Sequence, residues 1–90
     1  MKFNRVDNNQ KKLVKQIREL GGYVLHVFRI PNSFDILVGY KGELYIIEIK
    51  NDEKGKLTEG ELKCKEGFNS VGVDYHVIYN IEQFIELINK

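Results

Sequence analysis

The chain has 90 residues, 42% of them hydrophobic and 30% charged, and a formal net charge of +1 at pH 7. Its length predicts one small domain over residues 1–90 with a single hydrophobic core of limited size. No apolar run is long enough for a membrane span or a secretory signal, so we expect a cytoplasmic protein with no membrane partner. The only cysteine, Cys64, has no Cys or His partner at ligand spacing, which excludes an intrachain disulfide and argues against zinc.

The N-terminal third predicts a helix followed by a strand. Asp7 or Asn8 can cap the helix, and the glycines at 21–22 end it. The apolar stripe of this helix consists of Leu13, Val14, Ile17 and Leu20. Residues 23–30, YVLHVFRI, are rich in β-branched and aromatic residues and predict a strand.

The central segment predicts a β-hairpin made of residues 34–40 and 43–50, with Lys41 and Gly42 as a two-residue turn. A second helix follows, with Thr58 as its N-cap and Glu61 at the third helical position, as in a capping box. The chain then continues into a strand over residues 73–79. A last helix begins after Asn80, which can cap it.

The predicted order is therefore α-β-β-β-α-β-α. Both faces of the hairpin carry apolar residues, and a sheet of that kind needs cover on both sides. Three helices can supply this cover. We predict an α/β protein, a three-layer α/β/α sandwich around a central mixed sheet.

Three charges interrupt the apolar hairpin: Asp35, Glu48 and Lys50. A turn at 41–42 pairs Tyr40 with Glu43, and the same register places Asp35 directly opposite Glu48. Opposed residues share a face, and Lys50, two residues beyond Glu48, points to that face as well. The hairpin thus predicts a cluster of two carboxylates and one ammonium at its open end.

Like charges directly opposite each other destabilise a sheet unless a positive charge lies between them. Lys50 alone can supply that charge, in which case the cluster is a structural ion pair network. A divalent cation does so better, because two carboxylates, a backbone carbonyl and water are ligands that Mg²⁺ prefers. A metal in that place can activate water and polarise a phosphate, so the pattern also fits phosphodiester hydrolysis.

The spacing D-(12 residues)-E-x-K on a hairpin resembles the PD-(D/E)XK nuclease superfamily. The segments RVDNNQKKLVKQIRELGGYV, PNSFDILVGYKGELYIIEIKN and KLTEGE, taken in that order, resemble the small stand-alone VRR-NUC proteins of phages and bacteria. These proteins are in turn similar to Holliday-junction resolvases. The resemblance covers nearly the whole chain and implies a restriction-endonuclease-like fold in a bacterial or phage-infected cell.

The resemblance implies roles for individual residues. Asp35, Glu48 and the backbone carbonyl of Ile49 would be metal ligands, for Mg²⁺ or alternatively Mn²⁺, and Lys50 would position the attacking water. The family usually has a glutamate on the first helix that completes the site. Gln10 stands there in this chain and would assist with a neutral amide.

Two further positions depart from the family pattern. Phe34 precedes Asp35 where the family has proline, and Glu61 stands where the family often has glutamine. No organic cofactor is implied.

The basic residues are concentrated near the N-terminus, where residues 1–34 hold seven Lys or Arg and two acidic residues. Candidate phosphate contacts are Arg5, Lys11, Lys15, Arg18, Arg29, Lys54 and Lys56. Contacts of this kind give affinity without sequence preference, although each cation can equally be part of a solvated surface. No base-reading motif is visible, so recognition by DNA structure is the expectation.

Our leading hypothesis is a metal-dependent endonuclease that cleaves DNA, in particular branched DNA such as a four-way junction. Because one site cuts one strand, symmetrical cutting predicts a homodimer. The first alternative is a catalytically weak or inactive nucleic-acid-binding protein on the same fold, since Gln10 supplies no charge. The second is a small interaction protein with structural charges.

Overall fold

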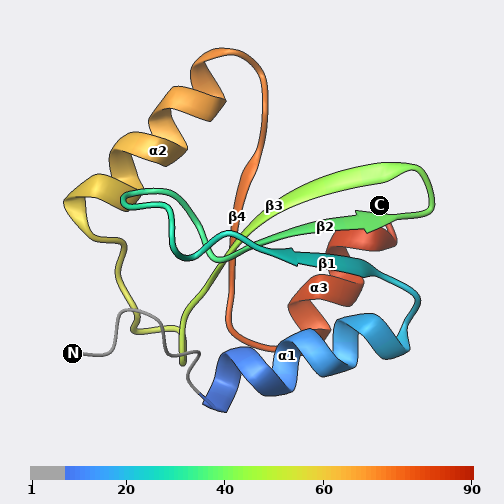
Figure 1. Cartoon of the computed structure of the whole chain (residues 1–90). Helices are drawn as coiled ribbons and strands as arrows, with labels where there is room; N and C mark the ends of the chain where they lie inside the picture. The colour runs from blue at the N-terminus through green and yellow to red at the C-terminus, as the bar shows by residue number, and fades with distance from the viewer. Residues whose placement is uncertain (1–7) are drawn as a thin grey trace.

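The computed structural model describes residues 8–90, which form three helices and four strands in the predicted order (Figure 1). The elements are α1 (Asn8–Glu19), β1 (Tyr23–His26), β2 (Ile36–Tyr40), β3 (Glu43–Ile49), α2 (Glu59–Ser70), β4 (Tyr75–Ile78) and α3 (Ile81–Ile88). None of the helices in this part of the chain has the length and apolar character needed to cross a bilayer.

The four strands form one mixed sheet in the order β1-β2-β3-β4. The first three strands are antiparallel neighbours, and β4 runs parallel to β3. The parallel pair requires a crossover, which is supplied by α2. The prediction of a mixed sheet flanked by helices is therefore confirmed.

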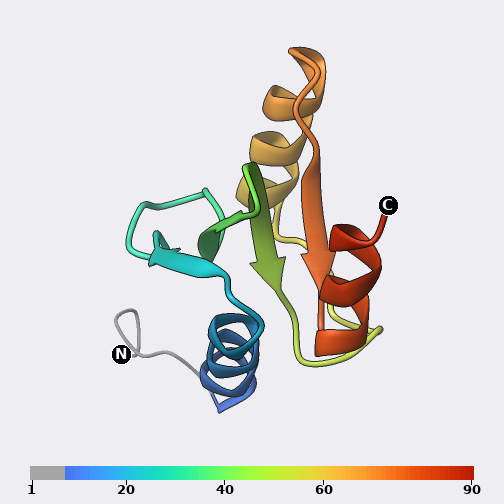
Figure 2. The ribbon, with the colours of Figure 1, turned by 90° about the vertical axis from the view of Figure 1, so that its right-hand side faces the viewer.

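The main core lies between the sheet and the pair of helices α1 and α3, which occupy the same side of it (Figure 2). The apolar stripe predicted for the first helix is largely buried here, and Leu20, at its C-terminal end, is exposed. Completely buried side chains in this core are Ile17, Ile36, Val38, Ile47 and Phe84. Removing such side chains from water is the main favourable term in the folding of the domain.

The opposite face of the sheet is covered only in part. Helix α2 lies on that side near β4, where the ring of Phe34 makes edge-on contacts with Phe68 and Tyr75. The helix itself has no buried residue. Leu44 and Tyr23, at the far end of the face, remain 69% and 74% exposed. The face predicted to be covered by a helix is therefore apolar but largely open at the β1 end.

The hairpin turn forms as predicted. Lys41 and Gly42 have φ angles of 47° and 84°, so both adopt the left-handed conformation that a two-residue hairpin turn of this type requires. Tyr40 pairs with Glu43, and the register continues to Ile36 opposite Ile47. This register decides which side chains meet at the open end of the hairpin.

The strand predicted over residues 23–30 is wrong in its second half, because β1 ends at His26. The N–H of Ile30 donates to the carbonyl of Val27 at 3.0 Å, and the hydroxyl of Ser33 donates to the carbonyl of Ile30 at 2.7 Å. These bonds fold residues 27–34 into a compact connection. The high β propensity of the segment is overridden because the chain must turn here to start β2.

Both predicted N-caps of the later helices are present. The Thr58 side chain accepts from the N–H of Glu61, and the Glu61 side chain accepts from the N–H of Thr58, which completes the capping box of α2. The Asn80 side chain accepts from the N–H of Gln83 at 3.0 Å at the start of α3. The cap proposed at Asp7 lies outside the described residues.

Candidate active site

The hairpin register places Asp35 beside Glu48 at the open end of β2 and β3. The strand pairing ends at Ile36 opposite Ile47, and the N–H of Asp35 also donates to the carbonyl of Ile47, at 3.1 Å. Asp35 and Glu48 line the same cavity, and burial raises the pKa of Asp35 although a side-chain hydrogen bond with Glu48 opposes this. The structure thus brings the two carboxyl groups together.

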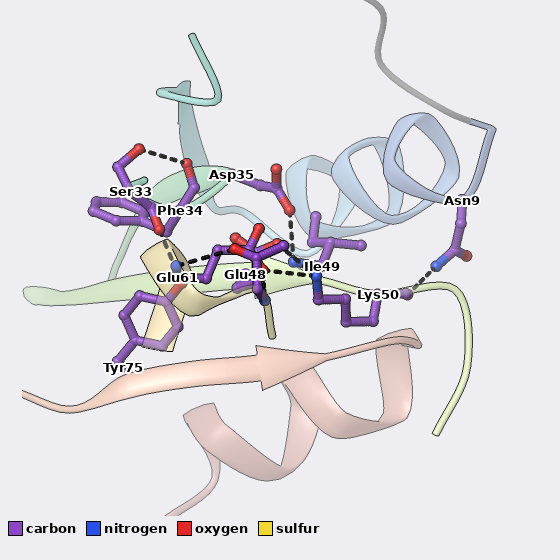
Figure 3. Close-up of polar contacts among 10 residues, drawn as sticks. Asn9, Ser33, Phe34, Asp35, Glu48, Ile49, Lys50, Glu61 and Tyr75 are labelled. Carbon is purple, nitrogen blue, oxygen red and sulfur yellow. Dashed lines mark hydrogen bonds and ion pairs between the residues drawn. The ribbon is translucent and has the colours of Figure 1, made fainter. Parts of the chain in front are cut away.

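The carboxylate of Asp35 is held in place by the backbone of β3. Its Oδ2 accepts a hydrogen bond of 2.8 Å from the N–H of Ile49 (Figure 3). In this position a side-chain oxygen, and not a backbone carbonyl, is the acceptor for that N–H. The acid is thus oriented without help from a bound ligand.

Lys50 lies in the same cluster and contacts two acidic side chains. Its Nζ is 3.4 Å from Oε2 of Glu48 and 2.9 Å from Oε1 of Glu61 (Figure 3). The three side chains come from the end of β3 and the start of α2. Burial alone lowers the pKa of Lys50, but its hydrogen bond to Glu61 and the charge of Glu48 outweigh this, and the net pKa is raised.

Glu48 is the most perturbed carboxyl group of the cluster. Only 3% of the residue is exposed, and burial, together with the charges of Asp35 and Glu61, raises its pKa to about 9. The pKa of Asp35 is also raised, chiefly by burial. A buried acid and a half-buried acid that both resist ionisation form a site where a cation is strongly stabilising.

The residues at this place suit an oxygen-preferring divalent cation. Asp35 and Glu48 provide two carboxylates, and the carbonyl of Ile49 is a third candidate ligand. Across residues 8–90, no group of three or more His, Cys, Asp or Glu side chains is arranged to hold a metal ion. Water would complete the coordination, which is usual for Mg²⁺.

The first helix reaches the site through Asn9. Its Nδ2 donates to the carbonyl of Lys50 at 2.7 Å and to the carbonyl of Tyr79 at 3.3 Å, so it connects α1 to the ends of β3 and β4. Gln10, the residue predicted to assist catalysis, is 6% exposed in the first turn of the same helix. Its catalytic role stays a prediction.

A cavity of about 220 Å³ opens beside the acids. Asp35, Glu48 and Glu61 line one part of it, and the connection between β1 and β2 forms another wall that includes Phe28 and Phe34. The carboxyl groups are therefore next to a space that a small part of a ligand can enter from solvent.

The predicted phosphate contacts lie on several elements and are not all in one place. Lys11, Lys15 and Arg18 line a cleft of about 540 Å³ beside α1, together with His26 of β1. Arg29 is exposed on the connection between β1 and β2, and Lys54 and Lys56 are exposed between β3 and α2. Arg5 lies outside the described residues.

Two residues of the cluster, Asn9 and Glu61, were absent from the predicted set of site residues. The capping-box pattern could have indicated Glu61, because a glutamate at that position folds back to the start of the helix, close to the chain that follows Lys50. Asn9 gave no sequence signal beyond its position next to Gln10. Its contacts depend on how α1 packs against the strand ends.

Comparison with known proteins supports the resemblance seen in the sequence. No protein-family model matches the chain, and no curated protein shows significant sequence similarity to it. Among solved structures, one described as a VRR_NUC domain is similar, with a TM-score of 0.70 and 29% sequence identity over 89% of each chain. The chain thus has a VRR-NUC-like, restriction-endonuclease-like fold.

Proposed function

We propose that this protein is a Mg²⁺-dependent endonuclease that hydrolyses phosphodiester bonds in DNA. The observation that carries the proposal is the pairing of Asp35 with Glu48 beside Lys50. Asp35 is oriented by the backbone N–H of Ile49, and Glu48 has a pKa raised to about 9 by burial and by neighbouring carboxylates. Perturbed acids next to an accessible cavity are typical of functional sites.

Asp35, Glu48 and the carbonyl of Ile49 would hold the metal ion, and Mn²⁺ is expected to replace Mg²⁺. A bound divalent cation would supply charge compensation and Lewis acidity toward a phosphate oxygen. Lys50 places its ammonium beside Glu48, where it can hydrogen-bond the attacking water and offset negative charge that develops on the phosphate. Gln10 would assist from α1.

The proposed substrate is DNA that is recognised by its shape. Lys11, Lys15 and Arg18 line one cleft, and the first of them is two residues from Asn9, which contacts the carbonyl of Lys50. A row of cations along one cleft suits the phosphate backbone of a strand. The other proposed contacts, Arg5, Arg29, Lys54 and Lys56, would add affinity without reading bases.

We propose in addition that the protein works as a homodimer on branched DNA. Cutting two strands symmetrically needs two active sites, and a two-fold dimer supplies them. Light scattering on the purified protein at micromolar concentration tests this part separately. A monomer in the presence and absence of DNA would contradict it and leave the chemistry of the single site unaffected.

A cleavage assay tests the function. Labelled duplex, flap, fork and four-way DNA are incubated with the protein in Mg²⁺, in Mn²⁺ and in EDTA. We expect metal-dependent cleavage, fastest on a branched substrate, and a loss of about 10²-fold or more in rate for Lys50→Ala. The matched control is Lys63→Ala, an exposed lysine on α2 that is not among the proposed contacts.

The alternative function is binding without cleavage, and the neutral Gln10 is the observation that favours it. In that case DNA binding would be salt-sensitive and unaffected by EDTA, and no product would form in either metal. Gln10→Glu then becomes informative, because a carboxylate at the proposed position should strengthen metal binding. If it does not, Gln10 has no place in the site.

A further inference from the structure

The side chain of Glu61 contacts both the start of α2 and Lys50, the residue that follows β3. Its Oε1 accepts a hydrogen bond of 2.9 Å from the N–H of Thr58 and lies 2.9 Å from Nζ of Lys50. The N–H of Glu61 in turn donates to Oγ1 of Thr58 at 3.1 Å. The carboxylate that caps the helix is therefore the same one that pairs with the lysine of the candidate active site.

The environment of this pair favours a fixed geometry. The side chains of Lys50 and Glu61 are 17% and 20% exposed, so water screens their attraction less than that of a surface pair. Glu61 lies 2.9 Å from the ammonium of Lys50, whereas Glu48 lies 3.4 Å from it, so Glu61 is the nearer of the two acidic partners.

The aliphatic part of Lys50 is confined from the other side by Gly55. A Cβ atom at position 55 would lie 2.7 Å from Cβ and 3.0 Å from Cγ of Lys50, closer than real side chains approach. The φ angle of Gly55 is not in the left-handed region, so only the close contact requires glycine there. The connection between β3 and α2 therefore packs directly on the lysine stem.

We propose that Glu61 is a positioning residue for Lys50, and that Glu61 and Gly55 together hold the ammonium beside Glu48. Glu61 contacts both the ammonium of Lys50 and the N–H of Thr58, each at 2.9 Å, so one carboxylate joins the lysine to the cap of α2. The expected effect on cleavage kinetics rests on the proposed nuclease function. The expected effect on the position of the Lys50 ammonium does not.

The chemistry of the pair defines which substitutions are informative. Glu61→Gln retains an acceptor oxygen for Lys50 and for the N–H of Thr58, and glutamine is accepted at this position of a capping box. Glu61→Ala removes both acceptors. Thr58→Ala removes the hydroxyl that accepts from the N–H of Glu61 but leaves the carboxylate in place, so it separates the effect of the cap from that of the lysine contact.

The first experiment measures Lys50 without any substrate or metal. In ammonium-selected ¹⁵N–¹H NMR spectra at low temperature and pH 6, a lysine that is hydrogen-bonded and shielded gives a signal, because its protons exchange slowly. We expect a Lys50 signal in the wild type, in Glu61→Gln and in Thr58→Ala, and none in Glu61→Ala or Gly55→Ala. A Lys50 signal of unchanged position and intensity in Glu61→Ala overturns the proposal.

The second experiment uses the cleavage assay. We expect Glu61→Ala to lower kcat at least tenfold with KM changed less than twofold, and Glu61→Gln to remain within threefold of the wild type. Mg²⁺ affinity should change less than twofold in Glu61→Gln. A glutamine variant as impaired as the alanine variant overturns the role as a positioning acceptor. If the wild type cleaves no DNA, the proposed function fails while the spectra still decide the position of Lys50.

Discussion

The carboxylate of Asp35 accepts a hydrogen bond from the backbone N–H of Ile49 at 2.8 Å, although the two residues are separated by the whole hairpin. Its acceptor is a side-chain oxygen that lies just before β2, and its donor is the last residue of β3. The bond fixes the direction of one acid of the pair before any ligand binds. Asp35 accepts this backbone hydrogen bond and is also a proposed metal ligand. Different substitutions at position 35 can therefore test the two roles separately.

Asp35→Asn and Asp35→Ala should therefore differ. Asparagine keeps an acceptor for the N–H of Ile49, so we expect a free energy of unfolding within about 1 kcal/mol of the wild type in EDTA, whereas alanine should cost about 1–2 kcal/mol more. Both should abolish stabilisation by Mg²⁺, because the charge is lost. Urea unfolding with and without Mg²⁺ measures both effects. Full Mg²⁺ stabilisation of Asp35→Asn would exclude this residue as a ligand.

The pKa of Glu48 predicts how stability depends on pH. Because burial and neighbouring carboxylates raise it to about 9 in the folded state, against an ordinary value of 4.5, the folded protein binds more protons than the unfolded chain between these values. The free energy of unfolding in EDTA should thus fall as pH rises from about 5 to 9.

Glu48→Gln is the matched variant for this pH dependence. It should flatten the slope and gain on the order of 1–2 kcal/mol at pH 8 in EDTA, since folding no longer requires the side chain at position 48 to take up a proton. Urea titrations at pH 5, 6.5 and 8 give the comparison. A slope in Glu48→Gln equal to that of the wild type would assign the effect to other groups.

Two glycines of α2 should respond in opposite ways to alanine. A Cβ at Gly60 would collide with the side chain of Asn32 in the connection between β1 and β2, whereas nothing lies within 4 Å of a Cβ at Gly67. We expect Gly67→Ala to stabilise by roughly 0.5–1 kcal/mol through helix propensity and Gly60→Ala to destabilise despite the same propensity gain. Thermal unfolding of the two variants side by side tests this. Equal stabilisation would mean that α2 does not pack closely on that connection.

The cations of the cleft beside α1 should govern the salt dependence of DNA binding. Lys15→Ala should weaken binding similarly on all sequences and reduce the slope of log K against log[salt] by about 1. Lys63→Ala, an exposed lysine of α2, should leave the slope unchanged. Fluorescence anisotropy between low and moderate salt, in EDTA to prevent cleavage, provides the measurement. Identical slopes in both variants would place the DNA elsewhere on the molecule.

The sequence by itself determined the elements of this protein and the pairing at the centre of the site. The two-residue turn at Lys41 and Gly42 and the N-caps at Thr58 and Asn80 are local features, so the order of elements and the hairpin register from Tyr40 opposite Glu43 to Ile36 opposite Ile47 could be predicted from them.

Only the tertiary structure decided what surrounds that pair. The strand that begins at Tyr23 ends at His26 because the chain must turn back to start β2. Local β propensity carries no information about that turn. The contact of Asn9 with the carbonyl of Lys50 spans 41 residues, and the contact of Glu61 with Lys50 depends on the docking of α2. Such contacts arise from packing between distant segments, whereas strand register and helix caps arise from neighbouring residues.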